Sequence, residues 1–124
     1  MTQKSILVVD DESAWTKLVK RAGERRGYQI EEACGISQAQ AILGTHAPFN
    51  LIISDMNMPG GNGDELFRWI REHPHHQATT FLLQTADTSQ ITAVTKALLA
   101  GGNARLRDKL SDKYLWDEVE EMLV

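Results

Sequence analysis

The stretch ILVVDD at residues 6–11 is a continuous apolar run of strand length that ends in two carboxylates, Asp10 and Asp11. A strand that is apolar on both faces is typical of a parallel sheet covered by helices on both sides. A simpler interpretation is an acidic pair that opens a helix, because the helix dipole favours negative charge there. That interpretation accounts for one carboxylate, and not for two beside a third at Asp55.

Two further apolar runs end in the same way. LIIS at residues 51–54 is followed by Asp55, and FLLQ at residues 81–84 is followed by Thr85. Because the carboxyl ends of parallel strands share one edge of a sheet, we expect the three carboxylates and the hydroxyl to lie together. Carboxylates this close repel one another, and such clusters usually hold a hard cation such as Mg²⁺. The alternative for Asp55 is a loop cap, but an unpartnered carboxylate at the end of a buried strand is costly.

Strand-like and helix-like segments alternate along the whole chain, which predicts an α/β fold of five βα units. The predicted strands are residues 5–9, 28–33, 51–54, 79–84 and 104–108. The predicted helices are residues 13–26 with Ser13 as cap, a helix opened by Ser37, a helix capped by Asp64 and ended by Pro74, residues 89–100 with Ser89 as cap, and a last helix from Ser111 or Asp112 to Val124.

The polarity of the strands predicts their order in the sheet. The first, third and fourth strands are continuously apolar and belong in the centre, whereas the second and fifth are more polar and belong at the edges. With right-handed connections this gives a doubly wound parallel sheet of order 2-1-3-4-5. The ligand site of such a sheet lies beyond the carboxyl ends of its first and third strands.

The composition is that of one small globular domain. Hydrophobic residues make up 42% of the 124 residues, and charged residues make up 24%. With 13 Lys+Arg against 17 Asp+Glu the net charge is −4, which argues against direct binding to nucleic acid. The single cysteine, Cys34, and the lack of a signal peptide predict a cytoplasmic protein. No apolar run approaches the ~20 residues of a membrane span, so we expect no membrane insertion.

The loop after the third predicted strand has residues suited to a ligand site. Asn57 lies two positions after Asp55, where its backbone carbonyl can serve as a further oxygen ligand. Pro59 stiffens the turn, and the glycines that follow let it fold tightly. The glycine-rich stretch lacks the spacing of a phosphate-binding P-loop, so we do not interpret it as one.

Together, these motifs resemble a known family. Residues 8–12 (VVDDE), residues 54–60 (SDMNMPG) and the pair Thr85-Ala86 resemble the receiver domain of two-component response regulators, related to the chemotaxis response regulator. The resemblance covers essentially the whole chain. It implies a flavodoxin-like fold and one receiver domain over residues 1–124 with no output domain attached. Whether the chain is a stand-alone regulator or a piece of a longer protein stays open.

The resemblance implies a role for each site residue. Asp55 would accept a phosphoryl group from a histidine kinase or a phosphotransfer protein, as a step of a phosphorelay. Asp10 and Asp11 would hold Mg²⁺ together with Asp55 and the carbonyl of Asn57, and Thr85 would supply a switch hydroxyl. Mg²⁺ offsets the charge on the phosphoryl oxygens, and the acyl phosphate that forms is labile, so the signal can be reset. The chain would not be an enzyme beyond phosphorylating and dephosphorylating itself.

The chain departs from the family pattern at its fifth predicted strand. The family ends this strand with Lys-Pro, three residues after an aromatic residue, whereas residues 104–110 here are ARLRDKL. Lys109, 24 residues after Thr85, matches the family's lysine if an inserted residue near Gly101 absorbs the longer interval. Without that shift Asp108 takes the lysine position, and the site lacks its cation.

The aromatic residue of the family's switch is also missing. Leu106 takes its place if Lys109 is the lysine, and Arg105 takes it if the register is shifted. We therefore hypothesise a modified output face, built from the fourth helix, the fifth strand and the fifth helix, that carries Lys96, Arg105 and Arg107. This face would bind a downstream protein target or effector domain, or a second copy of the chain in a homodimer. A solvated edge strand is the alternative.

Two other function classes stay open. A pseudo-receiver would keep the fold as an interaction module and signal without phosphate, and the departures around Lys109 support it. A haloacid-dehalogenase-like phosphatase also places an aspartate nucleophile at a strand end. It needs a second aspartate where this chain has Asn57, and a cap domain for which the chain has no room.

Three histidines, His73, His75 and His76, surround Pro74. They lack the helical pair spacing of a metal site, and no cysteine accompanies them. We interpret them as part of a solvated loop.

Overall fold

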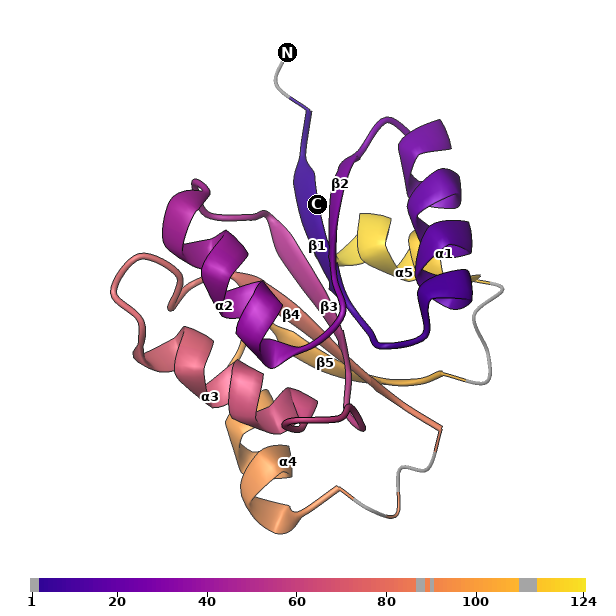
Figure 1. Cartoon of the computed structure of the whole chain (residues 1–124). Helices are drawn as coiled ribbons and strands as arrows, with labels where there is room; N and C mark the ends of the chain where they lie inside the picture. The colour runs from indigo at the N-terminus through magenta and orange to yellow at the C-terminus, as the bar shows by residue number, and fades with distance from the viewer. Residues whose placement is uncertain (1–2, 87–88, 90, 110–113) are drawn as a thin grey trace.

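The computed structural model describes residues 3–86, 89, 91–109 and 114–124. In that part of the chain five strands and five helices alternate (Figure 1). The strands are β1 (Ser5–Val9), β2 (Gln29–Ala33), β3 (Leu51–Asp55), β4 (Thr80–Thr85) and β5 (Ala104–Asp108). The helices are α1 (Ser13–Arg25), α2 (Ile36–Thr45), α3 (Gly63–Glu72), α4 (Ala93–Ala100) and α5 (Leu115–Met122).

The strands form one parallel sheet in the order β2-β1-β3-β4-β5, which confirms the predicted topology. Helices α1 and α5 cover one face of the sheet, and helices α2, α3 and α4 cover the other (Figure 1). Because every strand runs in the same direction, all the carboxyl ends lie at one edge of the sheet. Among the described residues no helix is long and apolar enough to cross a membrane.

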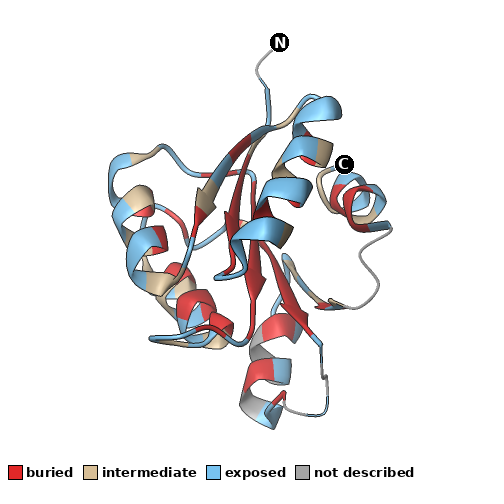
Figure 2. Cartoon of the chain, turned by 45° about the vertical axis from the view of Figure 1, so that its right-hand side comes forward, coloured by how far each residue is buried: buried red, intermediate tan, exposed pale blue. Residues whose placement is uncertain are grey.

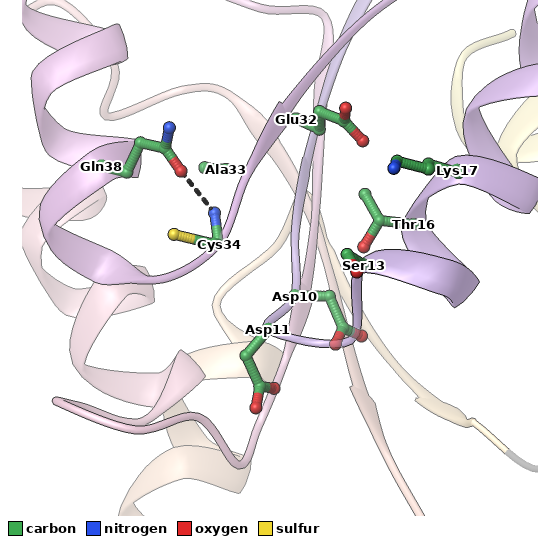
Figure 3. Close-up of a pocket in the computed structure, with 9 residues that line it drawn as sticks. All are labelled: Asp10, Asp11, Ser13, Thr16, Lys17, Glu32, Ala33, Cys34 and Gln38. Atoms are coloured by element: carbon green, nitrogen blue, oxygen red, sulfur yellow. Dashed lines mark hydrogen bonds between the residues drawn. The ribbon is translucent and has the colours of Figure 1, made fainter.

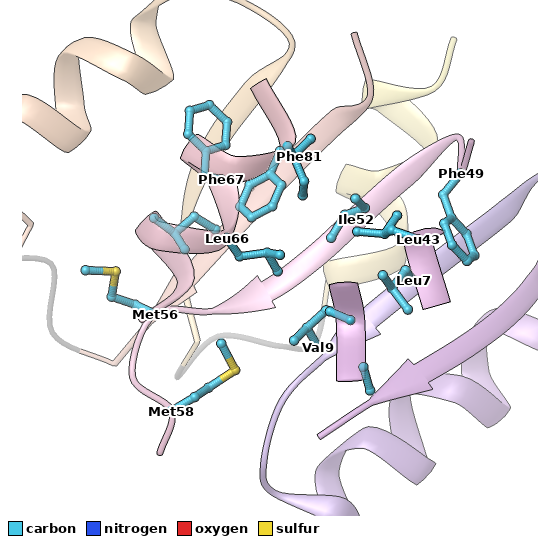
Figure 4. Close-up of a cluster of buried hydrophobic side chains, with 14 of the residues drawn as sticks. Leu7, Val9, Leu43, Phe49, Ile52, Met56, Met58, Leu66, Phe67 and Phe81 are labelled. Carbon is cyan, nitrogen blue, oxygen red and sulfur yellow. The ribbon is translucent and has the colours of Figure 1, made fainter. Parts of the chain in front are cut away.

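An apolar core lies on each face of the sheet. The core under α2, α3 and α4 includes Phe67 and Phe81, whose rings meet edge to face with centroids 4.9 Å apart (Figure 4). The core under α1 and α5 includes Val19, Leu82 and Trp116. The central strands are buried, whereas the outer sides of the helices are exposed (Figure 2). With both faces covered, a one-residue slip of a central strand would misplace all of its side chains, so the register at the carboxyl edge is strongly specified.

Helix α4 begins later than the sequence predicts. It starts at Ala93 and not at Ser89. The hydroxyl of Thr92 accepts the N–H of Thr95 at 3.1 Å, which is the bond of a helix cap. The predicted caps of the last helix, residues 111–112, lie outside the described residues.

Helix α3 also has a different cap from the predicted one. Its first turn is closed by a capping box in which the N–H of Asn62 donates to the carboxylate of Glu65 at 3.4 Å. The predicted cap, Asp64, lies inside the first turn, where its charge is still favourable to the helix dipole. Helix α2 begins at Ile36, one residue before Ser37.

The interpretation of the histidines as a solvated loop is wrong for His76. This side chain is only 3% exposed, and its Nε2 lies 2.9 Å from the carbonyl oxygen of Leu43 at the end of α2. Burial lowers the pKa of His76, so the ring is neutral there. His75, its neighbour, is exposed as predicted. His76 thus links the connection after α3 to helix α2, at the edge of the sheet opposite the carboxyl ends.

Candidate functional site

The carboxyl edge of the sheet brings three carboxylates together. Val9 of β1 pairs with Ser54 of β3, so the residues that follow them, Asp10 and Asp55, lie side by side. Asp10 and Asp55 are buried, with 2% and 6% of their surface exposed, while Asp11 is exposed. One carboxylate oxygen from each of the three residues lies within 4.8 Å of the others. The register of two adjacent strands therefore produces this acidic cluster.

Backbone contacts hold the loops that carry the carboxylates. The carboxylate of Asp10 accepts the N–H of Glu12 at 2.9 Å, which orients it at the start of α1. After β3, the N–H of Met56 donates to the carbonyl of Gln84 at 2.7 Å. The N–H of Gly63 then donates back to the carbonyl of Met56 at 2.8 Å. These bonds close the loop after β3 against β4 and against the start of α3.

Lys109 supplies a cation to the cluster. Its ammonium nitrogen lies 2.7 Å from a carboxylate oxygen of Asp10 and 3.2 Å from one of Asp55. A carboxylate oxygen of Glu12 lies 3.4 Å away. The indole ring of Trp15 also faces the ammonium, with its centroid 5.0 Å from the nitrogen, a distance typical of a cation–π contact.

The geometry of β5 distinguishes the two registers that the sequence left open. Thr85 pairs with Asp108, and the N–H of Lys109 donates to the carbonyl of Thr85 at 2.9 Å. Asp108 is exposed, whereas the side chain of Lys109 is 11% exposed and reaches Asp55. Lys109, which directly follows β5, therefore contacts the acidic cluster, and Asp108 does not take the lysine position.

Two contacts of Lys109 were not predicted from the sequence. Glu12 and Trp15 lie three residues apart at the start of α1, so they project from neighbouring positions of the helix surface. The three-residue spacing is the one sequence feature that links Glu12 and Trp15, but it does not show which residue the pair would contact. Trp15 also packs against the core under α1 and α5. In the sequence it therefore reads as an ordinary core residue, and its contact with Lys109 cannot be recognised.

Thr85 and Asn57 lie at the same edge of the sheet. Thr85 is fully buried at the end of β4, one residue beyond the strand partner of Asp55. The backbone N–H of Asn57 hydrogen-bonds to the carboxylate of Asp55, and Asn57 itself is exposed. The roles assigned to them, a switch hydroxyl and a carbonyl ligand, stay predictions.

The electrostatics of the cluster favour a further cation. Burial, and then the negative charge of Asp10, raise the pKa of Asp55 above its ordinary value, although Lys109 and the N–H of Asn57 oppose the rise. Burial alone would lower the pKa of Lys109, but its hydrogen bond to Asp10 and the charges of Asp10 and Asp55 raise it. The ammonium is therefore charged, and it does not fully offset the carboxylates. Three carboxylates are hard oxygen ligands, so Asp10, Asp11 and Asp55 fit Mg²⁺.

The acidic cluster is open to solvent on one side. A cavity of about 190 Å³ lies between the start of α1 and the start of α2, beside Asp10 and Asp11 (Figure 3). The residues that line it are Asp10, Asp11, Ser13, Thr16, Lys17, Glu32, Ala33, Cys34 and Gln38. Asp11 is exposed at this cavity, so the cavity gives access to the Asp10 and Asp11 side of the cluster.

Comparison with known proteins assigns this arrangement to a family. The family model of the response regulator receiver domain matches residues 6–120. The chain belongs to this family. It is therefore a receiver domain of two-component signalling with a flavodoxin-like fold.

Individual relatives match nearly the whole chain. The photosynthetic apparatus regulatory protein RegA of Rhodobacter capsulatus is 30% identical over 98% of this chain and 77% of RegA. The structure of the chemotaxis response regulator CheY4 of Vibrio cholerae covers 98% of this chain and 100% of CheY4, with a TM-score of 0.83 and 26% identity. Response regulator TrrA of Thermotoga maritima, solved in complex with Mg²⁺-BeF, covers 98% of this chain and 100% of its own, with a TM-score of 0.80 and 26% identity.

The output face predicted for this receiver domain needs one correction. Lys96 and Arg105 are exposed, as that hypothesis requires. Arg107 is only 8% exposed, and its guanidinium contacts Gln84 and Glu118. A guanidinium can be buried on the covered face of β5 because α5 supplies a carboxylate there. Arg107 is therefore part of the interior and not of a surface that binds a partner.

The raised pKa of Asp55 predicts how stability depends on pH. The folded receiver binds this proton more tightly than the unfolded chain, so the free energy of unfolding falls as the pH rises from the ordinary value of 3.8 through the raised pKa. Asp55→Asn has no ionisable group at this position, so it does not undergo this fall in the free energy of unfolding. In Mg²⁺-free urea titrations, we expect the variant to gain stability over the wild type progressively as the pH rises through that interval. The exposed control Glu31→Gln should show no such gain, and a constant difference between Asp55→Asn and the wild type would contradict the assignment.

Proposed function

We propose that this receiver domain accepts a phosphoryl group on Asp55 in a Mg²⁺-dependent step. The observation that carries the proposal is the position of Asp55, a buried strand-end carboxylate between the ammonium of Lys109 and the carboxylate of Asp10. A structural salt bridge would need one carboxylate for one ammonium. Here one ammonium faces several carboxylates, which is suited to receiving a divalent cation and an anionic phosphoryl group.

The chemistry follows from the residues present. An ionised oxygen of Asp55 attacks the phosphorus of a phosphohistidine; the P–O bond forms as the P–N bond breaks, and the imidazole keeps the electron pair and takes up a proton. Lys109 offsets negative charge on the transferred group, and the hydroxyl of Thr85 donates to one of its oxygens. When bound by Asp10, Asp11, Asp55 and the carbonyl of Asn57, Mg²⁺ supplies further charge compensation at the phosphoryl oxygens. Water attack on the acyl phosphate then restores Asp55, so the domain modifies and resets only itself.

Two comparisons support this proposal. Receiver domains of this family interact with histidine kinases and with effectors, so the donor would be a histidine kinase or a phosphotransfer protein. TrrA holds Mg²⁺-BeF, and this chain offers three carboxylates within 4.8 Å of one another for such an ion. The downstream target would bind the face of α4, β5 and α5, where Lys96 and Arg105 are exposed. The same face would serve a homodimer.

The two competing function classes lose their main support. The pseudo-receiver class requires a site that lacks its lysine, but Lys109 reaches both Asp10 and Asp55. The phosphatase needs a second catalytic acid two residues after its nucleophile, and Asn57 stands there. Neither class gains an independent observation from the described residues.

The test is phosphorylation by acetyl phosphate. With Mg²⁺, we expect the intact mass of the wild type to increase by one phosphoryl group and to return slowly, and Asp55→Asn to show no increase. EDTA should also prevent the modification. Asp108→Asn is the matched control, because its carboxylate lies one residue from Lys109 but is exposed and is not one of the three carboxylates of the cluster. No modification of the wild type would favour the pseudo-receiver, and repeated turnover of acetyl phosphate without a stable adduct would favour the phosphatase.

A further inference from the structure

A row of buried polar side chains crosses the sheet beside Asp55. In the strand register Asp55 pairs with Gln84 of β4, and Gln84 pairs with Arg107 of β5. Register partners in a parallel sheet project to the same face, so the three side chains form one continuous row. Gln84 is completely buried and Arg107 is 8% exposed. The row lies on the face covered by α1 and α5, since Leu82, two residues before Gln84, belongs to that core.

The row continues from the sheet into helix α5. The guanidinium of Arg107 donates to the amide oxygen of Gln84 at 3.1 Å and lies 3.2 Å from a carboxylate oxygen of Glu118. Glu118 belongs to α5, and its side chain is 26% exposed. A path of direct polar contacts therefore connects the strand neighbour of Asp55 to a helix of the proposed output face.

The side-chain amide of Gln84 has one hydrogen-bond donor without a partner. A guanidinium can only donate, so Arg107 fixes the amide of Gln84 with its oxygen toward β5. The amide nitrogen, Nε2, is buried and has no hydrogen-bond partner. A buried donor without an acceptor is costly, and such a group in a native structure requires an explanation. The residue beside it is Asp55, which would gain phosphoryl oxygens, and so additional acceptors, in the proposed modification.

The other face of the sheet offers a weaker connection in this chain. Thr85 follows Gln84 along β4 and so projects to the opposite face. Leu106, on that same face of β5, packs against the core under α2, α3 and α4 and cannot make a polar contact. Among the described ion pairs, those that join β5 to a helix are on the side of Arg107.

We propose that Gln84 and Arg107 are positioning residues that couple the state of Asp55 to helix α5 through Glu118. This inference rests on the proposed function, because it needs a phosphoryl group on Asp55. In the unmodified domain Gln84 is fixed by Arg107 and its Nε2 lacks an acceptor. When Asp55 carries the phosphoryl group, Nε2 turns to an acceptor there. The guanidinium then shifts, and the contact between Arg107 and Glu118 changes with it.

The test measures hydrogen exchange of α5 by mass spectrometry, with Mg²⁺ alone and with Mg²⁺ and beryllium fluoride as the phosphoryl mimic. We expect the mimic to change the exchange rate of residues 115–122 about threefold or more in the wild type, which corresponds to the lower end of the net contribution of one hydrogen bond. Gln84→Met and Glu118→Gln should lose this response. Glu121→Gln is the matched control, because both glutamates contact Arg105 but only Glu118 contacts Arg107. It should respond as the wild type does.

Exchange in the loop of residues 56–62 is the internal reference, because that loop follows Asp55 directly. If this loop is protected in every variant and the α5 response disappears only in Gln84→Met and Glu118→Gln, the coupling is supported. An unchanged α5 response in Glu118→Gln, which keeps the volume of that side chain and removes its charge, would overturn it while the proposed function stands. A wild type without protection at residues 56–62 would overturn the proposed function and this inference with it.

Discussion

Replacing Lys109 by methionine should lower the free energy of unfolding by about 3–5 kcal/mol in Mg²⁺-free buffer, the cost of breaking a buried ion pair by removing one partner. The side chain of Lys109 is 11% exposed, and those of its partners Asp10 and Asp55 are 0% and 8% exposed. Methionine keeps most of the volume of the lysine stem beside Trp15. The loss therefore measures the charge and its hydrogen bonds, because little packing is removed.

The same variant should respond more strongly to Mg²⁺ than the wild type does. Without the ammonium, the carboxylates of Asp10 and Asp55 repel each other with no compensation, and the pKa of Asp55 rises further because the opposing effect of Lys109 is lost. A divalent cation bound to the folded state relieves this repulsion. A ligand at 100 times its Kd stabilises by about 2.7 kcal/mol, so saturating Mg²⁺ should recover much of the loss.

Urea denaturation at increasing Mg²⁺ concentration, at a pH above the raised pKa of Asp55, measures both effects. Lys96→Met is the control, because that lysine is exposed on α4 and distant in sequence from the cluster. It should change neither the stability nor the response to Mg²⁺. A Lys109→Met protein as stable as the wild type in EDTA would mean that the short contacts to Asp10 and Asp55 contribute nothing, and the electrostatic description of the site would be wrong.

The acidic cluster was predictable because it depends on a few strong signals. The runs at residues 6–9 and 51–54 are apolar throughout, so their identity as central strands was unambiguous. Once those strands are adjacent and parallel, Asp10 and Asp55 must lie together. The strand order followed in the same way from the polarity of the edge strands. Local pattern and tertiary structure agree at these positions.

Strand β5 was harder to interpret because its pattern does not show which face is covered. Arg105 and Arg107 alternate with Leu106, and this is typical of an edge strand with a solvated face. The structure buries Arg107 through contacts with Gln84 and Glu118, residues distant in sequence. Charge pairing between such distant elements leaves no local periodicity. The lysine register stayed open for the same reason.

The buried hydrogen bond of Gln84 could not be predicted from the pattern of its own strand. It is a polar residue within the apolar run of β4, two positions after Leu82 and on the same face. A fully buried amide in such a run requires partners. The partner could be found only after β5 had been placed beside β4, because Arg107 is its register neighbour. The helix caps show a related limit: Ser89 and Thr92 are equally suitable caps by composition, and the tertiary path of the chain decides between them.

Gly63→Ala should destabilise the receiver domain by about 3 kcal/mol, at the upper end of the usual cost of overpacking. Gly63 is the first residue of α3, where the helix passes directly over the end of β3. A Cβ there would collide with the backbone oxygen of Asp55 and would lie 2.7 Å from Leu83 Cδ1 and 3.0 Å from Ser54 Oγ. A backbone oxygen cannot rotate away as a flexible side chain can, so either the start of α3 or the end of β3 must move.

Gly44→Ala is the matched control for this prediction, because Gly44 also lies in a helix and a Cβ there meets nothing within 4 Å. It should stabilise the domain by about 0.5–1 kcal/mol, as alanine does in place of glycine inside a helix. Urea denaturation gives both values. The added Cβ would collide with the backbone oxygen of Asp55, so we expect the end of β3 to move and Gly63→Ala to bind Mg²⁺ more weakly than the wild type. Gly44→Ala should bind Mg²⁺ as well as the wild type does. Suppose that Gly63→Ala lost stability but kept the Mg²⁺ affinity of the wild type. The strain would then be absorbed by α3 alone. The close packing of that helix on β3 would stabilise the fold without positioning the carboxylate of Asp55.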